Sequence, residues 1–222
     1  EAAQAALSGV LAGGGASRPA SSRHGIATPG SRGGPRQSRG ITPIGASGRV
    51  ATPAPDAPAA VSAVLTSGFL TQGPKVEEYE AALKEYLDYE RVLSVSSGTA
   101  GLTLALRLLK DEDPSFGWPG FDDTTDVVLT PALTCFATTC AVLDNNVKIR
   151  WLDTDTDSPN ISLADVKAKL NAHTKVIYLV HWGGCPVDLD ALDQICEEHK
   201  AQYGFKPMVV EDCAHAFGAE YK

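Results

Sequence analysis

The residues best suited to chemistry follow a short apolar run near the end of the chain. Glu211, Asp212 and His215 come directly after residues 208–210, which read Met-Val-Val. Two carboxylates are costly to bury at the end of a strand. They are therefore either solvated loop residues or groups that hold a positive charge.

A second candidate lies in the sequence SSGTA at residues 96–100. Gly98 would let the backbone approach a ligand closely, and the hydroxyls of Ser97 and Thr99 can donate hydrogen bonds, as an anion-binding turn at a helix start requires. The stretch is neither a Walker loop nor a G-x-G-x-x-G fingerprint. Taken alone, such a stretch is more often an ordinary Ser/Thr helix cap.

Two further candidates follow apolar runs, at Phe136 and His181. Taken alone, an aromatic residue such as Phe136 is more often part of a core, and His181 and His215 are more often structural histidines. Together, however, a phosphate-binding turn, a stacking aromatic and the Asp212 carboxylate match what pyridoxal phosphate needs, because its ring nitrogen must stay protonated to act as an electron sink. A lysine to hold that cofactor is the missing part.

The elements that would position these residues alternate between strands and helices. The hydrophobic pattern predicts strands at 91–95, 126–130, 148–153, 175–180 and 208–211, and helices at 59–65, 75–87, 100–110, 135–143, 162–170 and 188–200. This alternation predicts an α/β domain with a mainly parallel sheet and helices on both faces. Ligands bind outside the carboxyl ends of the strands in such sheets, and each candidate group follows a predicted strand.

The first 58 residues differ in composition from the rest. They contain 11 Gly and 7 Pro, have no aromatic residue and carry a formal charge of +4. Such a segment buries too little apolar surface to offset its ordering entropy, so we predict that residues 1–58 are disordered. Their Arg- and Ser-rich, acid-poor character also resembles an organellar transit peptide. Residues 59–222 are predicted to form the cofactor-binding domain.

Charge and cysteine content narrow the class of protein. Residues 59–222 carry a formal charge of −12, which argues against a nucleic-acid-binding core. No run of about 18 apolar residues occurs, so we expect no membrane span. The five cysteines follow no metal or disulfide framework, which favours free thiols and a reducing compartment, with no metal. We expect a cytoplasmic protein, or an organellar one if residues 1–58 are a transit peptide.

From about residue 68 the chain resembles the DegT/DnrJ/EryC1/StrS family, the pyridoxal-phosphate-dependent sugar aminotransferases of fold type I. The resemblance rests on five stretches in the family's order: GFLTQGPKVEEYE (68–80), VSSGTAGLTLAL (95–106), TPALTCFATTCAVL (130–143), VHWGGCPVDLDAL (180–192) and VEDCAHAFGAEY (210–221). It covers about the last two-thirds of the chain and implies the large domain of that fold, without the small C-terminal domain.

The resemblance also implies which residues bind the cofactor. Gly98, Thr99 and Ala100 would hold its phosphate through backbone N–H groups and the Thr99 hydroxyl. Phe136 would stack on one face of the pyridine ring, and Ala214 would pack near the other.

Two residues would take part in catalysis. Asp212 would pair with the ring nitrogen and His215 would lie near the phenolic oxygen, whereas Glu211 is interpreted as structural. The family's Schiff-base lysine lies in a segment downstream of Lys222. We therefore expect a piece of a longer product, because the chain begins with Glu1 and lacks that segment, and we expect the chain alone to be inactive.

Three hypotheses follow. The first is transfer of an amino group from glutamate or glutamine to a nucleotide-linked keto-sugar, by an enzyme that is a homodimer when complete. The second is a lysine-less sugar dehydratase of the same family, which uses a pyridoxamine cofactor. The third is a non-catalytic remnant or regulatory protein. A Ser-His-Asp hydrolase fits poorly because no G-x-S-x-G elbow is present. The sugar, its ring position and the amino donor stay open.

Overall fold

The computed structural model describes residues 10–11 and 54–221. The helices in these ranges are α1 (Ala57–Ser67), α2 (Pro74–Leu87), α3 (Gly98–Leu108), α4 (Phe136–Asp144), α5 (Leu163–Lys169) and α6 (Leu189–Tyr203). The strands are β1 (Val10–Leu11), β2 (Val127–Pro131), β3 (Lys148–Leu152), β4 (Thr174–Val180) and β5 (Met208–Asp212). Most of the predicted disordered segment 1–58 lies outside the described residues.

The strands form one sheet in the order β1-β5-β4-β2-β3. The four strands β5, β4, β2 and β3 are parallel to their neighbours, and β1 pairs antiparallel with β5. This order confirms the prediction of a mainly parallel sheet. In the parallel pairing of β4 with β5, Val180 lies opposite Asp212, so the two strands end side by side.

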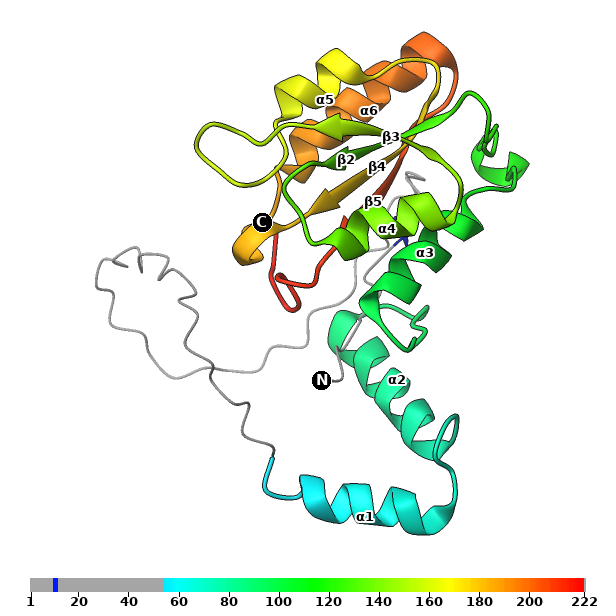
Figure 1. Ribbon diagram of the computed structural model, residues 1–222, viewed down its shortest axis with the longest axis vertical. Helices are drawn as coiled ribbons and strands as arrows, with labels where there is room; N and C mark the ends of the chain where they lie inside the picture. Colours follow the sequence, from blue (N-terminus) through cyan, green and yellow to red (C-terminus); the bar gives the residue numbers. More distant parts are fainter. Residues whose placement is uncertain (1–9, 12–53, 222) are drawn as a thin grey trace, which may run out of the picture. The chain divides into compact units, whose positions relative to one another are not determined.

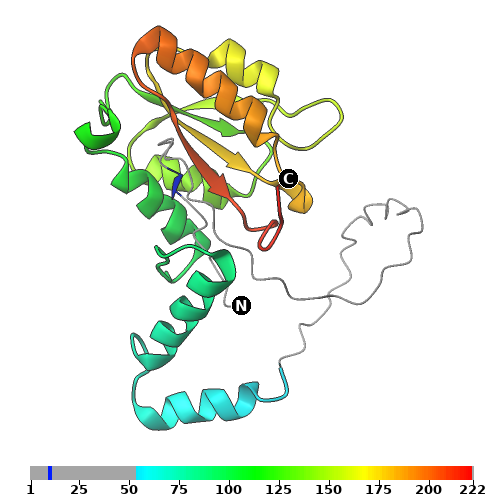
Figure 2. The ribbon, with the colours of Figure 1, turned by 180° about the vertical axis from the view of Figure 1, so that it is seen from behind.

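Both faces of the sheet are covered by helices (Figures 1 and 2). One core combines side chains of α3 and α4, such as Leu106 and Val142, with Val176 and Tyr178 of β4. The other core combines side chains of α5 and α6 with the alternate residues of β4, including Ile177. Successive side chains of a strand point to opposite faces, so residues 176–180 of β4 are all apolar, and every residue of the strand is buried. The prediction of helices on both faces is confirmed.

One predicted strand is wrong. Residues 91–95 form no strand, although three of the five are apolar. The carboxylate of Glu80 on α2 accepts hydrogen bonds from the backbone N–H of Ser94 at 2.8 Å and from its hydroxyl at 2.7 Å. Leu93 also stays exposed. A side chain thus takes the hydrogen bond that a neighbouring strand would have supplied.

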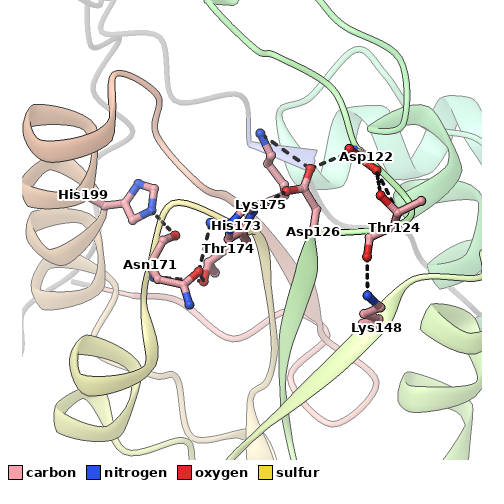
Figure 3. A network of polar contacts seen from close by, with 9 residues as sticks. All are labelled: Asp122, Thr124, Asp126, Lys148, Asn171, His173, Thr174, Lys175 and His199. Atoms are coloured by element: carbon pink, nitrogen blue, oxygen red, sulfur yellow. Dashed lines mark hydrogen bonds and ion pairs between the residues drawn. The ribbon is translucent and has the colours of Figure 1, made fainter.

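A polar network joins the amino ends of the strands, at the opposite edge of the sheet from the candidate residues (Figure 3). Asp126, buried just before β2, accepts a hydrogen bond from the N–H of Asp122 at 2.8 Å. Its other contacts are the Nζ atom of Lys175, 3.7 Å away, and the Nδ1 atom of His173, 3.5 Å away. The Lys175 ammonium also lies 4.2 Å from the centre of the Phe205 ring. The buried Asp126 carboxylate therefore has partners near the start of β2 and near the start of β4.

Helix α1 belongs to a different unit of the chain from the sheet. The sequence predicted this helix at 59–65, and it ends at Gly68, whose φ of 80° is the left-handed conformation that glycine adopts most easily. None of its residues is buried. Across the two described ranges, no helix is both long and apolar enough to span a membrane.

Candidate functional site

The carboxyl ends of β2, β4 and β5 meet at one edge of the sheet because these strands are parallel. Hydrogen bonds join the loops that follow them. The indole Nε1 of Trp182 donates to the carbonyl of Leu133 at 2.8 Å, and the backbone N–H of His181 donates to the carbonyl of Asp212 at 3.3 Å. The loops with the predicted candidate residues are thus brought together.

Asp212, the last residue of β5, is half-buried and its carboxylate is held at both oxygens. The hydroxyl of Thr138 on α4 donates to Oδ2 at 2.9 Å, and the backbone N–H of Ala214 donates to Oδ1 at 3.0 Å. A carboxylate oxygen can accept more than one hydrogen bond, so this geometry fixes the group and leaves lone pairs for a ligand.

Glu211 has a different partner. Its Oε2 lies 2.8 Å from Nε2 of the buried His181. Burial lowers the pKa of His181, whereas hydrogen bonds with Cys213 and Glu211 raise it to about 9. The backbone N–H of Val187 donates to Nδ1 at 3.1 Å, a bond that Nδ1 accepts only while it carries no proton. The raised pKa favours the charged ring, whereas the Val187 contact requires the neutral one; with that contact made, the single ring proton lies on Nε2 and is donated to Glu211.

This hydrogen-bonded group has the composition of a metal site. The ligand atoms of His181, Glu211 and Cys213 all lie within 4.8 Å of one another. A ligating histidine, however, must present an unprotonated nitrogen to the metal and usually donates its other N–H to an acceptor. The Val187 N–H at Nδ1 imposes the opposite arrangement. The contacts therefore describe a hydrogen-bonded support for the end of β5, in agreement with the structural interpretation of Glu211.

His215 lies in the turn after β5, exposed and beside Trp182. The two rings make an edge contact with centres 5.2 Å apart, and the backbone N–H of Gly183 donates to Nδ1 at 3.3 Å. The proton of the neutral ring is thus placed on Nε2. Gly184 has a φ of 81°, and a Cβ there would lie 2.9 Å from the His215 carbonyl oxygen, so the close approach of the two turns requires glycine.

Phe136 begins α4, and 71% of its surface is exposed. This exposure rules out the core interpretation of its side chain. Two residues further along the helix, Thr138 is fully buried and contacts Asp212. The start of α4 therefore places an uncovered aromatic ring and a support for the carboxylate on one turn of helix.

The predicted phosphate-binding stretch begins α3. Ser97 caps this helix and its Oγ accepts from the N–H of Ala100 at 3.1 Å, whereas Gly98 and Thr99 belong to the first turn, whose N–H groups have no intrahelical acceptor. A hydrogen bond from the Tyr178 hydroxyl to the carbonyl of Leu102, at 2.7 Å, ties α3 to β4. Burial, followed by the charge of Asp212, raises the pKa of Tyr178.

Sequence reasoning missed two contributors to this edge. Thr138 lies inside the TPALTCFAT stretch, but the hydrophobic pattern of a helix does not show whether a threonine side chain will bind a residue of another element. Trp182 was quoted within HWGG without a role, and its indole and backbone connect the loops after β2, β3 and β4. All five cysteines are free, as the sequence indicated.

Comparison with known proteins identifies the family of this chain. Residues 54–222 match the DegT/DnrJ/EryC1/StrS aminotransferase family. The chain belongs to this family. Its members depend on pyridoxal phosphate, and the match confirms the resemblance inferred from the five sequence stretches.

Relatives within the DegT/DnrJ/EryC1/StrS family include sugar aminotransferases. The chain is 35% identical over 163 residues to a UDP-4-amino-4-deoxy-L-arabinose–oxoglutarate aminotransferase from Shewanella sediminis, covering 73% of this chain and 38% of the relative. The structure of the sugar aminotransferase CalS13 from Micromonospora echinospora matches with a TM-score of 0.67 and 43% identity over 74% of this chain and 42% of that protein. The chain thus spans about two-fifths of the length of either relative.

A third relative has been solved with its cofactor. Spr1654 from Streptococcus pneumoniae is 28% identical, with a TM-score of 0.62 over 71% of this chain and about two-fifths of that protein, and its structures include pyridoxal phosphate and pyridoxamine phosphate forms. The residues of the present chain fit such a group. A fixed carboxylate, an uncovered aromatic ring and a helix N-terminus are the chemistry that a pyridinium ring and its phosphate require.

Proposed function

We propose that this chain is the cofactor-binding part of a pyridoxal-phosphate-dependent enzyme that transfers an amino group from glutamate or glutamine to a nucleotide-linked keto-sugar. The observation that carries the proposal is the Asp212 carboxylate, held at both oxygens at a strand end. Family membership and the sugar aminotransferase relatives support it.

Each residue of the site has a distinct task in this proposal. The N–H groups of Gly98, Thr99 and Ala100 and the Thr99 hydroxyl bind the cofactor phosphate at the start of α3. When a phosphate takes the place of the Ser97 hydroxyl, the N–H of Ala100 becomes free to bind it. A helix N-terminus favours negative charge because of its unsatisfied N–H groups and its dipole.

The remaining residues act on the ring. Phe136 stacks on one face and Ala214 packs near the other. Asp212 pairs with the ring nitrogen and keeps it protonated, and Nε2 of His215 donates toward the phenolic oxygen. When bound, pyridoxal phosphate supplies an electron sink for the carbon that exchanges its amino group.

A lysine downstream of residue 222 would hold the cofactor and move the proton. The identity of that residue separates amino transfer from the dehydratase hypothesis, because the dehydratases carry histidine there. Homodimer formation, with sites that both subunits complete, remains our prediction for the complete enzyme.

The test uses the full-length protein with pyridoxal phosphate, glutamate labelled with heavy nitrogen and a nucleotide-linked keto-sugar. We expect the label to appear in the sugar product and 2-oxoglutarate to be released in equal amount. Borohydride should attach the cofactor covalently to one lysine. A protein that binds pyridoxamine phosphate and eliminates water from the sugar, without label transfer, would support the dehydratase instead. Binding neither cofactor would favour the non-catalytic hypothesis.

A further inference from the structure

Thr138 makes an unusual choice of hydrogen-bond partner. A threonine within a helix commonly donates to a carbonyl of the preceding turn. Its neighbour Thr139 does so, donating to the carbonyl of Phe136 at 3.1 Å. Thr138, which is fully buried, instead donates from α4 to Oδ2 of Asp212 on β5, 74 positions away in the sequence, at 2.9 Å.

The direction of this hydrogen bond is fixed by the chemistry of its acceptor. An ionised carboxylate only accepts, so the single hydroxyl proton of Thr138 is directed at Asp212. The oxygen of Thr138 then accepts from the hydroxyl of Thr134, which lies 2.8 Å away. Donation runs in one direction, from Thr134 through Thr138 to Asp212.

The two oxygens of Asp212 have donors from different elements. Oδ2 takes the Thr138 hydroxyl of α4, and Oδ1 takes the N–H of Ala214 in the following turn. With both oxygens held, rotation of the carboxylate about its bond to Cβ would break one bond or the other. Ala214 is two residues from Asp212 in the same segment, so its N–H moves together with Asp212. Thr138 lies on α4, so its hydrogen bond fixes the carboxylate relative to another element.

We propose that Thr138 is a positioning residue, which orients the Asp212 carboxylate toward the cofactor ring nitrogen, and that Thr134 supports it. This inference rests on the proposed function and extends it to two residues that do not themselves touch the cofactor. The hydrogen bond of Thr138 to a charged group belongs to the stronger class of such bonds in proteins.

The test measures the binding of pyridoxamine phosphate to the full-length protein, because this probe needs no lysine. Thr138→Val removes the hydroxyl and keeps the shape, whereas Thr138→Ser keeps the hydroxyl. Thr139→Val is the matched control, since it removes an adjacent buried hydroxyl whose bond stays within the helix. A second probe carries carbon in place of the ring nitrogen, so that Asp212 has no ring proton to bind. Thermal unfolding checks that each variant folds, and Thr138→Ala replaces Thr138→Val if the latter does not.

We expect Thr138→Val to bind pyridoxamine phosphate about tenfold more weakly than the wild type, with Thr138→Ser and Thr139→Val within about twofold. The carbon analogue should bind the wild type and Thr138→Val within about twofold of each other. Equal losses for Thr138→Val and Thr139→Val, or an equal loss for both probes, would overturn the positioning role and leave the proposed function intact. Failure of the wild type to bind pyridoxamine phosphate would overturn both.

Discussion

Nε2 of His181 lies 2.8 Å from Oε2 of Glu211, while the adjacent Asp212 receives its hydrogen bonds from Thr138 and Ala214. Successive side chains of a strand point to opposite faces, so the two neighbouring carboxylates have separate environments. The Glu211 carboxylate is paired with His181 within the protein. Asp212 is held in place but keeps lone pairs for a ligand.

This difference predicts opposite effects of two isosteric substitutions. Asp212→Asn should weaken pyridoxamine phosphate binding about 100-fold, because it removes the charge that pairs with the ring nitrogen. Its free energy of unfolding should change little. Glu211→Gln should lower the free energy of unfolding by about 1–3 kcal/mol, since it weakens a bond to a buried histidine, and should leave affinity within about threefold.

Cofactor titration and denaturant unfolding of both variants measure these effects. If Glu211→Gln weakened binding as strongly as Asp212→Asn, the assignment of separate tasks to the two carboxylates would be wrong.

The exposure of Phe136 predicts that its ring serves binding rather than stability. Phe136→Leu should leave the free energy of unfolding within about 0.5 kcal/mol, because a 71% exposed side chain contributes little to the core. Affinity for pyridoxamine phosphate should fall about five- to tenfold through lost stacking. Phe116, 57% exposed and outside the site, supplies the control substitution Phe116→Leu, which should change neither quantity. A drop in stability with unchanged affinity would contradict the binding role of Phe136.

We predict that Glu80 contributes to the pH dependence of the unfolding free energy in acid. Hydrogen bonds from the side chain and then the backbone of Ser94 lower the pKa of Glu80 below 4.5. A carboxyl with a lowered folded pKa stabilises the protein above its unfolded pKa, and this stabilisation is lost as pH falls through the folded pKa. Unfolding free energy should therefore decrease below about pH 4.5 less steeply in Glu80→Gln than in the wild type. Urea unfolding at several pH values measures both slopes, and equal slopes would contradict the prediction.

The buried charge of Asp126 predicts a coupling with Lys175. Asp126→Ala should lower the free energy of unfolding by about 3 kcal/mol, because it leaves the buried Lys175 ammonium without its carboxylate. Adding Lys175→Met should recover part of that loss, since the uncompensated charge is then removed. Denaturant unfolding of the single and double variants gives the coupling energy. Purely additive losses would show that the two groups act independently.

Local patterns were sufficient to predict the elements whose stability comes from their own burial. Strand β4 spans Thr174–Val180 and contains an unbroken apolar run at 176–180, and the sequence predicted it at 175–180. The end of α1 could be predicted from Gly68 for a different reason, because the residue type alone favours the left-handed turn. The edge of the sheet at which the candidate residues meet also followed, since parallel strands share their carboxyl ends.

Partners distant in sequence could not be predicted from the same patterns. The short apolar run at 91–95 resembled a strand, but nothing local indicated that Glu80 would bind Ser94. Likewise, the sequence drew attention to Asp212 but not to Thr138, because a hydroxyl shows no preference for the partner it will meet 74 positions away. Interactions that depend on the assembled fold require the structure.

The complete burial of β4 has a consequence for the exchange of amide hydrogens with solvent. With β5 and β2 paired on its two sides and a core on each face, its backbone N–H groups can reach deuterated water only when the whole sheet opens. The amides of β4 should therefore be the last in the domain to take up deuterium, at a rate set by global unfolding. Substitutions such as Phe136→Leu, which act on the site alone, should leave that rate unchanged.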